Sequence, residues 1–196
     1  MNLTGPKKTK TITRIGVLAA VASVLYFIPG IPIVPPIYKL DFSSLPVILG
    51  GFSLGIVPSL IILAIKDIIG LFHSSSLGVG ELADFVTSAC MVIAAVSVYK
   101  RNRTLKGALV ALAAGTVAMV VSGALVNWLV MIPFYVTVMH LPLESIIAMV
   151  GKLIPFVDTL PKLIIFATVP FNLLKGVVLS VLCFLLYKRI SAFLKV

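Results

Sequence analysis

Two polar side chains stand inside the last long apolar run of the chain, residues 161–187. Asn172 and Lys175 lie three residues apart in the segment 170–176, PFNLLKG, so on a helix they share one face. A charged side chain at the centre of a membrane helix costs about 2.5–3.5 kcal/mol, and such groups normally face a protein interior or a wet cavity. The amide and the ammonium therefore predict one wall of a cavity that hydrogen-bonds a solute.

Three more polar side chains could face the same cavity. Glu81 and Asp84 begin the apolar run 81–99 at a spacing of three residues and so share a face, although the helix dipole also stabilises acids in a first turn. Asn127 lies in the outer third of the run 105–132. Together these groups indicate a pocket that suits a mid-sized, planar or amphipathic solute with hydrogen-bonding groups.

Lys66 and Asp67 are a further pair of charges within an apolar run. Because adjacent residues of a helix cannot point the same way, we expect these two to pair with groups on neighbouring helices. A structural role is favoured over ligand binding.

No sequence signature of an enzyme is present. The chain has no GxSxG, no HExxH and no Walker A lysine loop. Cys90 and Cys183 stand alone in apolar runs, and His73 and His140 are far apart, so neither a disulfide nor a metal site is predicted. A chain without an ATP site cannot itself drive uphill transport by hydrolysis.

The composition is that of a multi-pass membrane protein. Hydrophobic residues make up 60% of the 196 residues and charged residues 11%, against roughly 25% charged residues in an average soluble domain. No segment between the apolar runs is long enough to build a soluble core. We therefore predict an all-α protein of the cell membrane.

The net charge of +10 is concentrated in three purely basic clusters. Their members are Lys7, Lys8, Lys10 and Arg14; Lys100, Arg101, Arg103 and Lys106; and Lys188, Arg189 and Lys195. The positive-inside rule places all three clusters, and both termini, in the cytoplasm. Each cluster adjoins an apolar run without interleaved aromatic residues, so nucleic-acid binding is not predicted.

An even number of spans must separate each pair of basic clusters. The run 45–72 is interrupted by 50–58, GGFSLGIVP, and splitting it there satisfies this condition. The sequence then predicts six transmembrane helices in a single domain, 1–196. Their expected bounds are 13–28, 44–54, 56–72, 81–99, 105–132 and 161–187. The short helix 44–54 covers only about 16 Å, so its neighbours must shield it.

The first outer loop, 29–44, contains four prolines that hold it extended. It combines apolar side chains with Lys39 and Asp41. A stiff, partly apolar loop beside a polar cavity predicts an ordered lid, with a plain connector as the alternative. The third outer loop, 133–160, has helical character at 143–153.

Five stretches of the chain resemble one known family. They are 39–55, KLDFSSLPVILGGFSLG; 78–85, GVGELADF; 99–109, YKRNRTLKGAL; 124–135, ALVNWLVMIPFY; and 170–176, PFNLLKG. In this order, and with six predicted spans, the chain resembles the riboflavin-specific substrate-binding (S) components of energy-coupling factor (ECF) vitamin transporters. The resemblance covers nearly the whole chain.

The resemblance implies a membrane subunit that captures riboflavin from outside under a first loop that closes over the vitamin. Riboflavin would be the transported ligand, and no cofactor is implied. ATP-driven uptake implies two kinds of partner, a transmembrane coupling (T) subunit and two ABC-type ATPases. The alternatives are an S component for another vitamin and, less favoured, a small intramembrane enzyme.

The resemblance also implies roles for single residues. The candidate substrate-binding residues are Lys39, Leu40, Asp41, Glu81, Asp84, Asn127, Asn172 and Lys175. Asn127, Asn172 and Lys175 are implied as hydrogen-bond partners of the flavin ring or the ribityl chain, and the others as further groups of the pocket. Asp84 departs from the asparagine expected at its position, which leaves its role open.

Small residues of the first span imply the contact with the T subunit. The family pattern is Ala-x-x-x-Ala, and the matching residues are Gly16 and Ala20, with Ala19 and Ser23 beside them. Glycine and serine also permit the close approach of two helices. The alternative is a packing face within the chain itself.

Overall fold

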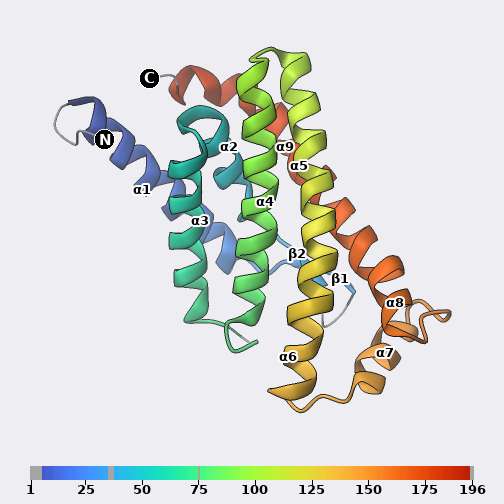
Figure 1. Ribbon diagram of the computed structural model, residues 1–196. Coiled ribbons are helices and arrows are strands. Elements are labelled where there is room, and N and C mark those ends of the chain that lie inside the picture. Colours follow the sequence, from blue (N-terminus) through green and yellow to red (C-terminus); the bar gives the residue numbers. More distant parts are fainter. Residues whose placement is uncertain (1–5, 35–37, 75, 195–196) are drawn as a thin grey trace.

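The computed structural model describes residues 6–34, 38–74 and 76–194, so Lys195 of the third basic cluster lies outside it. The described chain is mostly helical, and its helices pack against one another along much of their length (Figure 1). The main helices are α1 (Pro6–Phe27), α2 (Leu45–Leu54), α3 (Ile56–Leu71), α4 (Val79–Arg101), α5 (Leu105–Val126) and α9 (Val169–Leu194).

The first outer loop is extended, as expected, and forms a small sheet in an otherwise mostly helical chain. β1 (Ile31–Val34) pairs with β2 (Tyr38–Leu40) in antiparallel fashion. The prolines of the loop favour this extended backbone. Tyr38 and Leu40 are buried while Lys39 between them is exposed, which is the alternation of a strand with one buried face.

Gly55 separates α2 from α3 in the middle of the apolar run. Its φ of +100° lies in a region that strains any residue other than glycine, and its N–H donates to the Gly51 carbonyl at 3.0 Å. α2 is buried along most of its length, which shields a helix too short to cross a bilayer alone. The two helices lie within one residue of the bounds expected for them.

Two long helices contain a wide π-turn with a proline just beyond it. The elements concerned are the π-turns η1 (Asn127–Met131) and η2 (Ile164–Thr168) and the short helices α6 (Ile132–Thr137) and α8 (Leu160–Leu163). At the end of each π-turn an N–H donates to the carbonyl five residues earlier. Pro133 and Pro170 follow, and a proline cannot donate to the carbonyl four residues back, which favours a wider turn before it.

Four helical segments are long and apolar enough to cross a membrane. They are Thr9–Phe27, Val79–Arg101, Leu105–Thr137 and Leu160–Leu186. α2 and α3 are apolar but shorter, with 10 and 16 residues. The described chain therefore has several helices that can cross a membrane.

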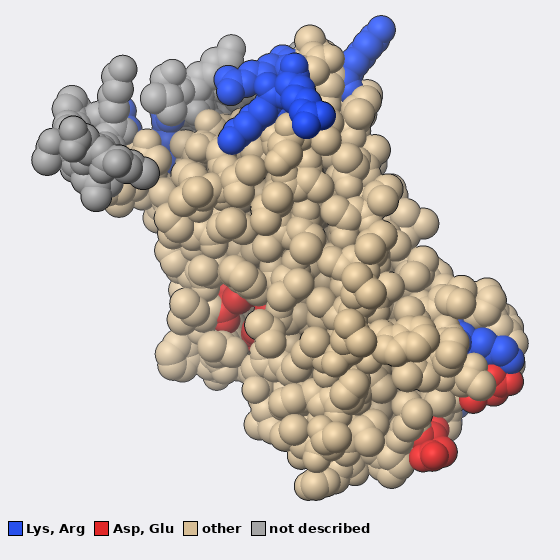
Figure 2. All heavy atoms as spheres, in the orientation of Figure 1, with Lys and Arg blue, Asp and Glu red and all other residues tan. Residues whose placement is uncertain are grey.

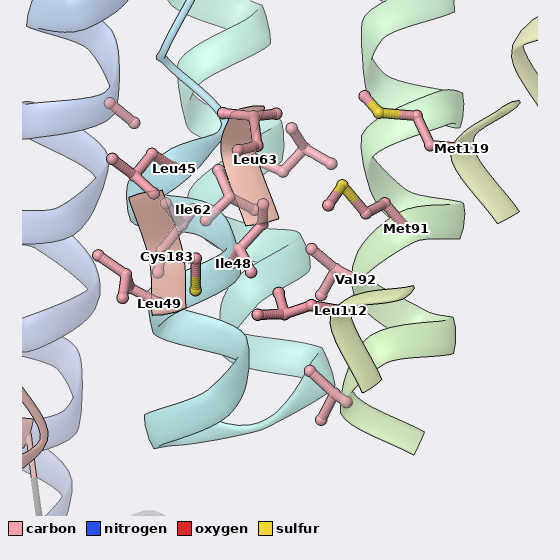
Figure 3. Packing of buried hydrophobic residues seen from close by; sticks show 14 of the residues in the cluster. Leu45, Ile48, Leu49, Ile62, Leu63, Met91, Val92, Leu112, Met119 and Cys183 are labelled. Carbon is pink, nitrogen blue, oxygen red and sulfur yellow. The ribbon is translucent and has the colours of Figure 1, made fainter. Parts of the chain in front are cut away.

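The main apolar core surrounds α2. Figure 3 shows its side chains meeting between the helices: Leu45, Ile48, Leu49, Ile62, Leu63, Met91, Val92, Leu112, Met119 and Cys183. Gly50 allows α2 to approach α3, since an added Cβ would lie 2.7 Å from the Ile62 side chain. Lipid is as apolar as these residues, so close packing rather than exclusion of water holds the helices together.

A second apolar cluster lies under the third outer loop. The helix α7 (Leu143–Gly151) falls within the segment 143–153, where helical character was expected. Its Ile146 and Val150 are buried against residues that include Tyr38 of β2 and Phe171 of α9. The cluster thus ties the first and third outer loops to the end of α9.

Charged side chains lie toward the two ends of the molecule. The basic residues 100–106, at the turn between α4 and α5, are exposed, and Figure 2 shows basic atoms at that end. Acidic atoms appear only in the other half of the visible face, and the surface between them is nearly free of charge. A belt of this kind suits contact with lipid.

Candidate functional site

Buried ion pairs join the first outer loop to the helices. The Lys175 ammonium on α9 donates to Asp41 Oδ2 at 2.9 Å and to Asp84 Oδ1 at 2.8 Å. Asp41 follows β2, and Asp84 lies in the second turn of α4. One buried ammonium therefore links the loop, α4 and α9.

Lys66 on α3 extends this network of ion pairs. Its ammonium donates to the other oxygen of Asp84 and lies 2.7 Å from Asp67 Oδ1. Lys66 thus pairs with a neighbouring helix, as expected. The expectation that Lys66 and Asp67 point apart is wrong, because the flexible lysine side chain also reaches its own neighbour. Two ammonium groups thus face three carboxyl groups.

Asp41 is charged at neutral pH. Burial alone would raise the pKa of its carboxyl, but the Lys175 and Lys66 ammonium groups and the Ser43 hydrogen bond together outweigh burial and hold this pKa below its usual range. Its Oδ1 accepts further hydrogen bonds from the N–H group, at 3.0 Å, and the hydroxyl of Ser43. The attraction between Asp41 and Lys175 draws the first loop onto the helices.

Tyr38 makes the second contact between the loop and the helices. Its hydroxyl donates to Asn127 Oδ1 at 3.0 Å and lies 2.6 Å from Thr168 Oγ1. Its ring stacks on Phe171 with a centroid distance of 4.8 Å and an interplanar angle of 22°. Burial raises the pKa of the hydroxyl to about 12, so Tyr38 keeps its proton at physiological pH and spans both π-turns.

The two asparagines are fixed to their own helices. Asn127 Nδ2 donates to the Gly123 carbonyl at 2.9 Å, which leaves its oxygen to Tyr38. Asn172 Nδ2 donates to the Thr168 carbonyl at 2.9 Å. A Cβ added at Gly123 would lie 2.6 Å from Asn172 Oδ1, so this glycine makes room for the amide. The amides are thereby held beside an aromatic pair, an arrangement that can bind a planar solute with polar edges.

A model of the family described as "ECF transporter, substrate-specific component" matches residues 10–187. The chain belongs to this family. It is 32% identical to the riboflavin transporter RibU of Staphylococcus aureus (strain TCH60), over 96% of this chain and 94% of the relative. It is 25% identical to the riboflavin transporter FmnP of Bacillus subtilis (strain 168), over 96% of this chain and 95% of the relative.

The fold of this S component also matches a solved structure. The match is to "Structure and mechanism of the S component of a bacterial ECF transporter", with a TM-score of 0.74, 30% identity and coverage of 96% of this chain and 99% of that chain. The resemblance drawn from five sequence stretches is confirmed. The S component is a transporter subunit of the cell membrane, not an enzyme, and spans the membrane several times.

Two predicted site residues of the S component stand apart from the ion-pair network. Lys39 is exposed on the face of β2 opposite to Tyr38. Glu81 accepts hydrogen bonds from the hydroxyls of Tyr26 and Ser74, both at 2.7 Å, rather than from Lys175. The structure thus joins Asp41, Asp84 and Lys175 directly. It places Asn127 and Asn172 around Thr168, and it buries Leu40 beneath the loop.

Sequence reasoning missed three members of the site in this S component. Tyr38 had a usable signal, because it alternates with Lys39 in an extended loop and so faces the opposite side. Phe171 had a weaker one, since it lies between Pro170 and Asn172 in a stretch already singled out. Thr168 had none, because its position depends on the π-turn before α9.

The small residues of α1 divide between two faces. Gly16 and Ala20 are exposed, whereas Ala19 and Ser23 are buried. Ala19 belongs to the core of the S component itself, and the Ser23 hydroxyl donates to its carbonyl at 2.9 Å. Gly16 and Ala20 are therefore the pair that a second protein could approach.

Proposed function

We propose that this S component binds riboflavin at its outer end for ATP-driven uptake by an ECF complex. The carrying observation is the buried Lys175 ammonium, which Asp41 of the first loop and Asp84 of α4 hold in place, about one helical turn along α9 from the fixed amide of Asn172. The relatives that are riboflavin transporters by name support the choice of vitamin.

In the proposed pocket, polar side chains hydrogen-bond the ligand and aromatic rings pack against it. Asn127, Asn172 and Lys175 hydrogen-bond the flavin ring or the ribityl chain, while Phe171 and Tyr38 offer ring faces. The proposed binding residues are Leu40, Asp41, Asp84, Asn127, Asn172 and Lys175. Lys39 and Glu81 are set aside, because the first is exposed and the second is bonded elsewhere.

The first loop acts as the lid in this proposal. Asp41 and Tyr38 hold it onto α9 and the π-turns, so release of these two contacts opens the pocket. The ordered two-stranded sheet supports a lid over a plain connector.

We also propose six membrane spans with both termini on the cytoplasmic side. Four segments are long enough to cross, and the buried α2 together with α3 supplies the remaining two. The exposed basic residues 100–106 lie at the cytoplasmic end in this arrangement, in agreement with the positive-inside rule. The outer loops then carry the lid and α7.

The proposed partners are a T subunit and two ABC-type ATPases. Membership of the family supports this assembly. Exposed Gly16 and Ala20 on α1 offer a smooth helical face for the T subunit, because small side chains let two membrane helices approach closely.

Purified S component tests the vitamin directly. We expect the protein to bind riboflavin and quench its fluorescence at a ratio of one to one, and to retain the flavin absorbance band through gel filtration. Thiamine and biotin serve as matched competitors and should not displace it. A protein that leaves riboflavin fluorescence unchanged would refute the assignment, and displacement by another vitamin would favour the alternative S component.

A further inference from the structure

A cavity of about 300 Å³ lies between the adjoining ends of α3 and α4. Most of its lining side chains are apolar, and two are acidic, Asp67 and Glu81. In Figure 2 acidic atoms are visible in a hollow on an otherwise uncharged part of the surface. An apolar recess with acidic groups has the character of a binding site.

The carboxyl oxygens of Asp67 can accept further hydrogen bonds. Only 6% of its surface is exposed, and its Oδ2 accepts no hydrogen bond from any residue that the structure describes. Oδ1 lies 2.7 Å from the Lys66 ammonium without a well-directed hydrogen bond, and Lys66 also serves Asp84. A buried carboxylate normally has its oxygens hydrogen-bonded or paired.

The cavity lies at the acidic end of the ion-pair network. Two ammonium groups face three carboxyl groups in that network, and Asp67 is the carboxyl group at its end. Glu81 adds a further carboxyl group to the lining, and its oxygens accept hydrogen bonds from the hydroxyls of Tyr26 and Ser74 rather than from an ammonium group. A buried carboxyl group that shares its one ammonium partner with a second carboxylate can accept a further cationic donor.

The cavity opens where lipid can reach it. Ile68, Leu71 and Leu82 line it and are half exposed. Asp67 lies four residues before the end of α3, a rise of about 6 Å, so its carboxyl group is close to the end of the helix. An aliphatic chain can therefore pack at the opening while a polar head reaches inward.

An organic ammonium fits this site better than an inorganic cation. Metal ions such as Ca²⁺ require about six or more oxygen ligands. The described residues contain no group of three or more acidic, histidine or cysteine side chains placed to hold a metal ion. A primary ammonium needs only a few acceptors and supplies three N–H donors.

We propose that the cavity between α3 and α4 binds the primary ammonium head group of an aminophospholipid, with Asp67 as its counter-ion. The acyl chains pack along the exposed apolar residues of α3 and α4. Choline lipids are poor ligands, because their trimethylammonium group has no N–H donor and is wider. The site is joined to the proposed vitamin pocket through Lys66, which contacts both Asp67 and Asp84, but it takes a different class of ligand.

Native mass spectrometry of the full-length, delipidated S component tests the proposal. Phosphatidylethanolamine and phosphatidylcholine with identical acyl chains are titrated separately. We expect the wild type to retain the ethanolamine lipid about tenfold better, a ratio that corresponds to about 1.4 kcal/mol. Asp67→Asn should retain both lipids equally, while Glu144→Gln, which changes an exposed acid on α7, should keep the preference.

A second variant distinguishes loss of the binding site from a folding defect in Asp67→Asn. Ala64→Phe fills the cavity without changing any charge, and it should also abolish the preference while the thermal unfolding midpoint stays near that of the wild type. Equal retention of the two lipids by the wild type would overturn the proposal. A preference that survives in Asp67→Asn or in Ala64→Phe would do the same.

Discussion

Lys175 bonds two carboxylates that lie far apart in the sequence, one before α2 and one in α4. Removing one partner of a buried ion pair leaves an uncompensated charge and typically costs about 3–5 kcal/mol. The same ammonium is the proposed donor to riboflavin. Binding and folding are therefore linked at this residue.

Replacement of Lys175 tests whether this buried lysine, unlike an exposed one, contributes to riboflavin binding. Lys175→Ala should weaken riboflavin binding by about 1–3 kcal/mol, the scale for a buried polar group that loses its partner, and should lower the thermal midpoint. Fluorescence titration measures the affinity. Lys162→Ala is the matched control, because Lys162 forms an exposed pair with Asp158. Wild-type affinity in Lys175→Ala would remove this residue from the site.

The Asp41–Lys175 pair gives the stability of the fold a pH dependence. The folded-state pKa of Asp41 lies below the ordinary aspartate value of about 3.9. Its contribution is therefore fully present above that ordinary value and is lost as the pH falls through the folded-state pKa. The thermal midpoint should fall on acidification from about pH 5 to about pH 3, and less steeply in Asp41→Asn. Parallel slopes would show that the pair contributes nothing.

The elements of the fold were more predictable than their contacts. Gly55 between two apolar runs, and the prolines of residues 29–36, were sufficient to place a helix break and an extended loop. Pro133 and Pro170 are visible in the sequence, but the π-turns before them were not predicted, because they depend on packing. The partners of Asp84 could not be read from the sequence, since α3, α4 and α9 meet only in three dimensions.

The close packing of α5 against α9 at Gly123 should fix the position of the Asn172 amide. Gly123→Ala places a methyl group within 2.6 Å of the Asn172 side chain, so that amide must move. We expect Gly123→Ala and Asn172→Ala to weaken riboflavin binding by a similar amount, about 1–3 kcal/mol. The double variant should lose little more than either single one. Additive losses, measured by fluorescence titration, would show that the glycine acts elsewhere.

At the scale of the whole molecule, charge and small residues support the proposed orientation and contacts. The exposed basic turn at residues 100–106 lies at one end of the molecule, and the visible acidic atoms lie in the other half, next to a few basic ones. The composition was sufficient to predict this arrangement, because hydropathy and the positive-inside rule need no tertiary contacts. Only the structure shows which small residues of α1 are buried and which are exposed, because both pairs have the same spacing in the sequence.

Enlarging the exposed face of α1 should separate binding from transport. Gly16→Leu or Ala20→Leu should leave riboflavin affinity unchanged but abolish uptake by the complete complex, because a large side chain prevents close approach of the T subunit. Vesicle uptake of labelled riboflavin measures transport. Ala113→Leu, on an exposed position of α5, is the control and should transport normally. Normal uptake by both α1 variants would contradict the proposed face.

Each π-turn places one more residue in its helix than a regular α-helical path would need. One residue corresponds to about 100° of rotation about the axis. Relatives that build these helices without π-turns should therefore align with this chain only through single-residue gaps at 127–131 and 164–168. Where such a gap occurs, the side chains beyond it are rotated to another face. The positions of such gaps would then divide the members of the family into groups that differ in which helix face carries the side chains beyond the π-turn.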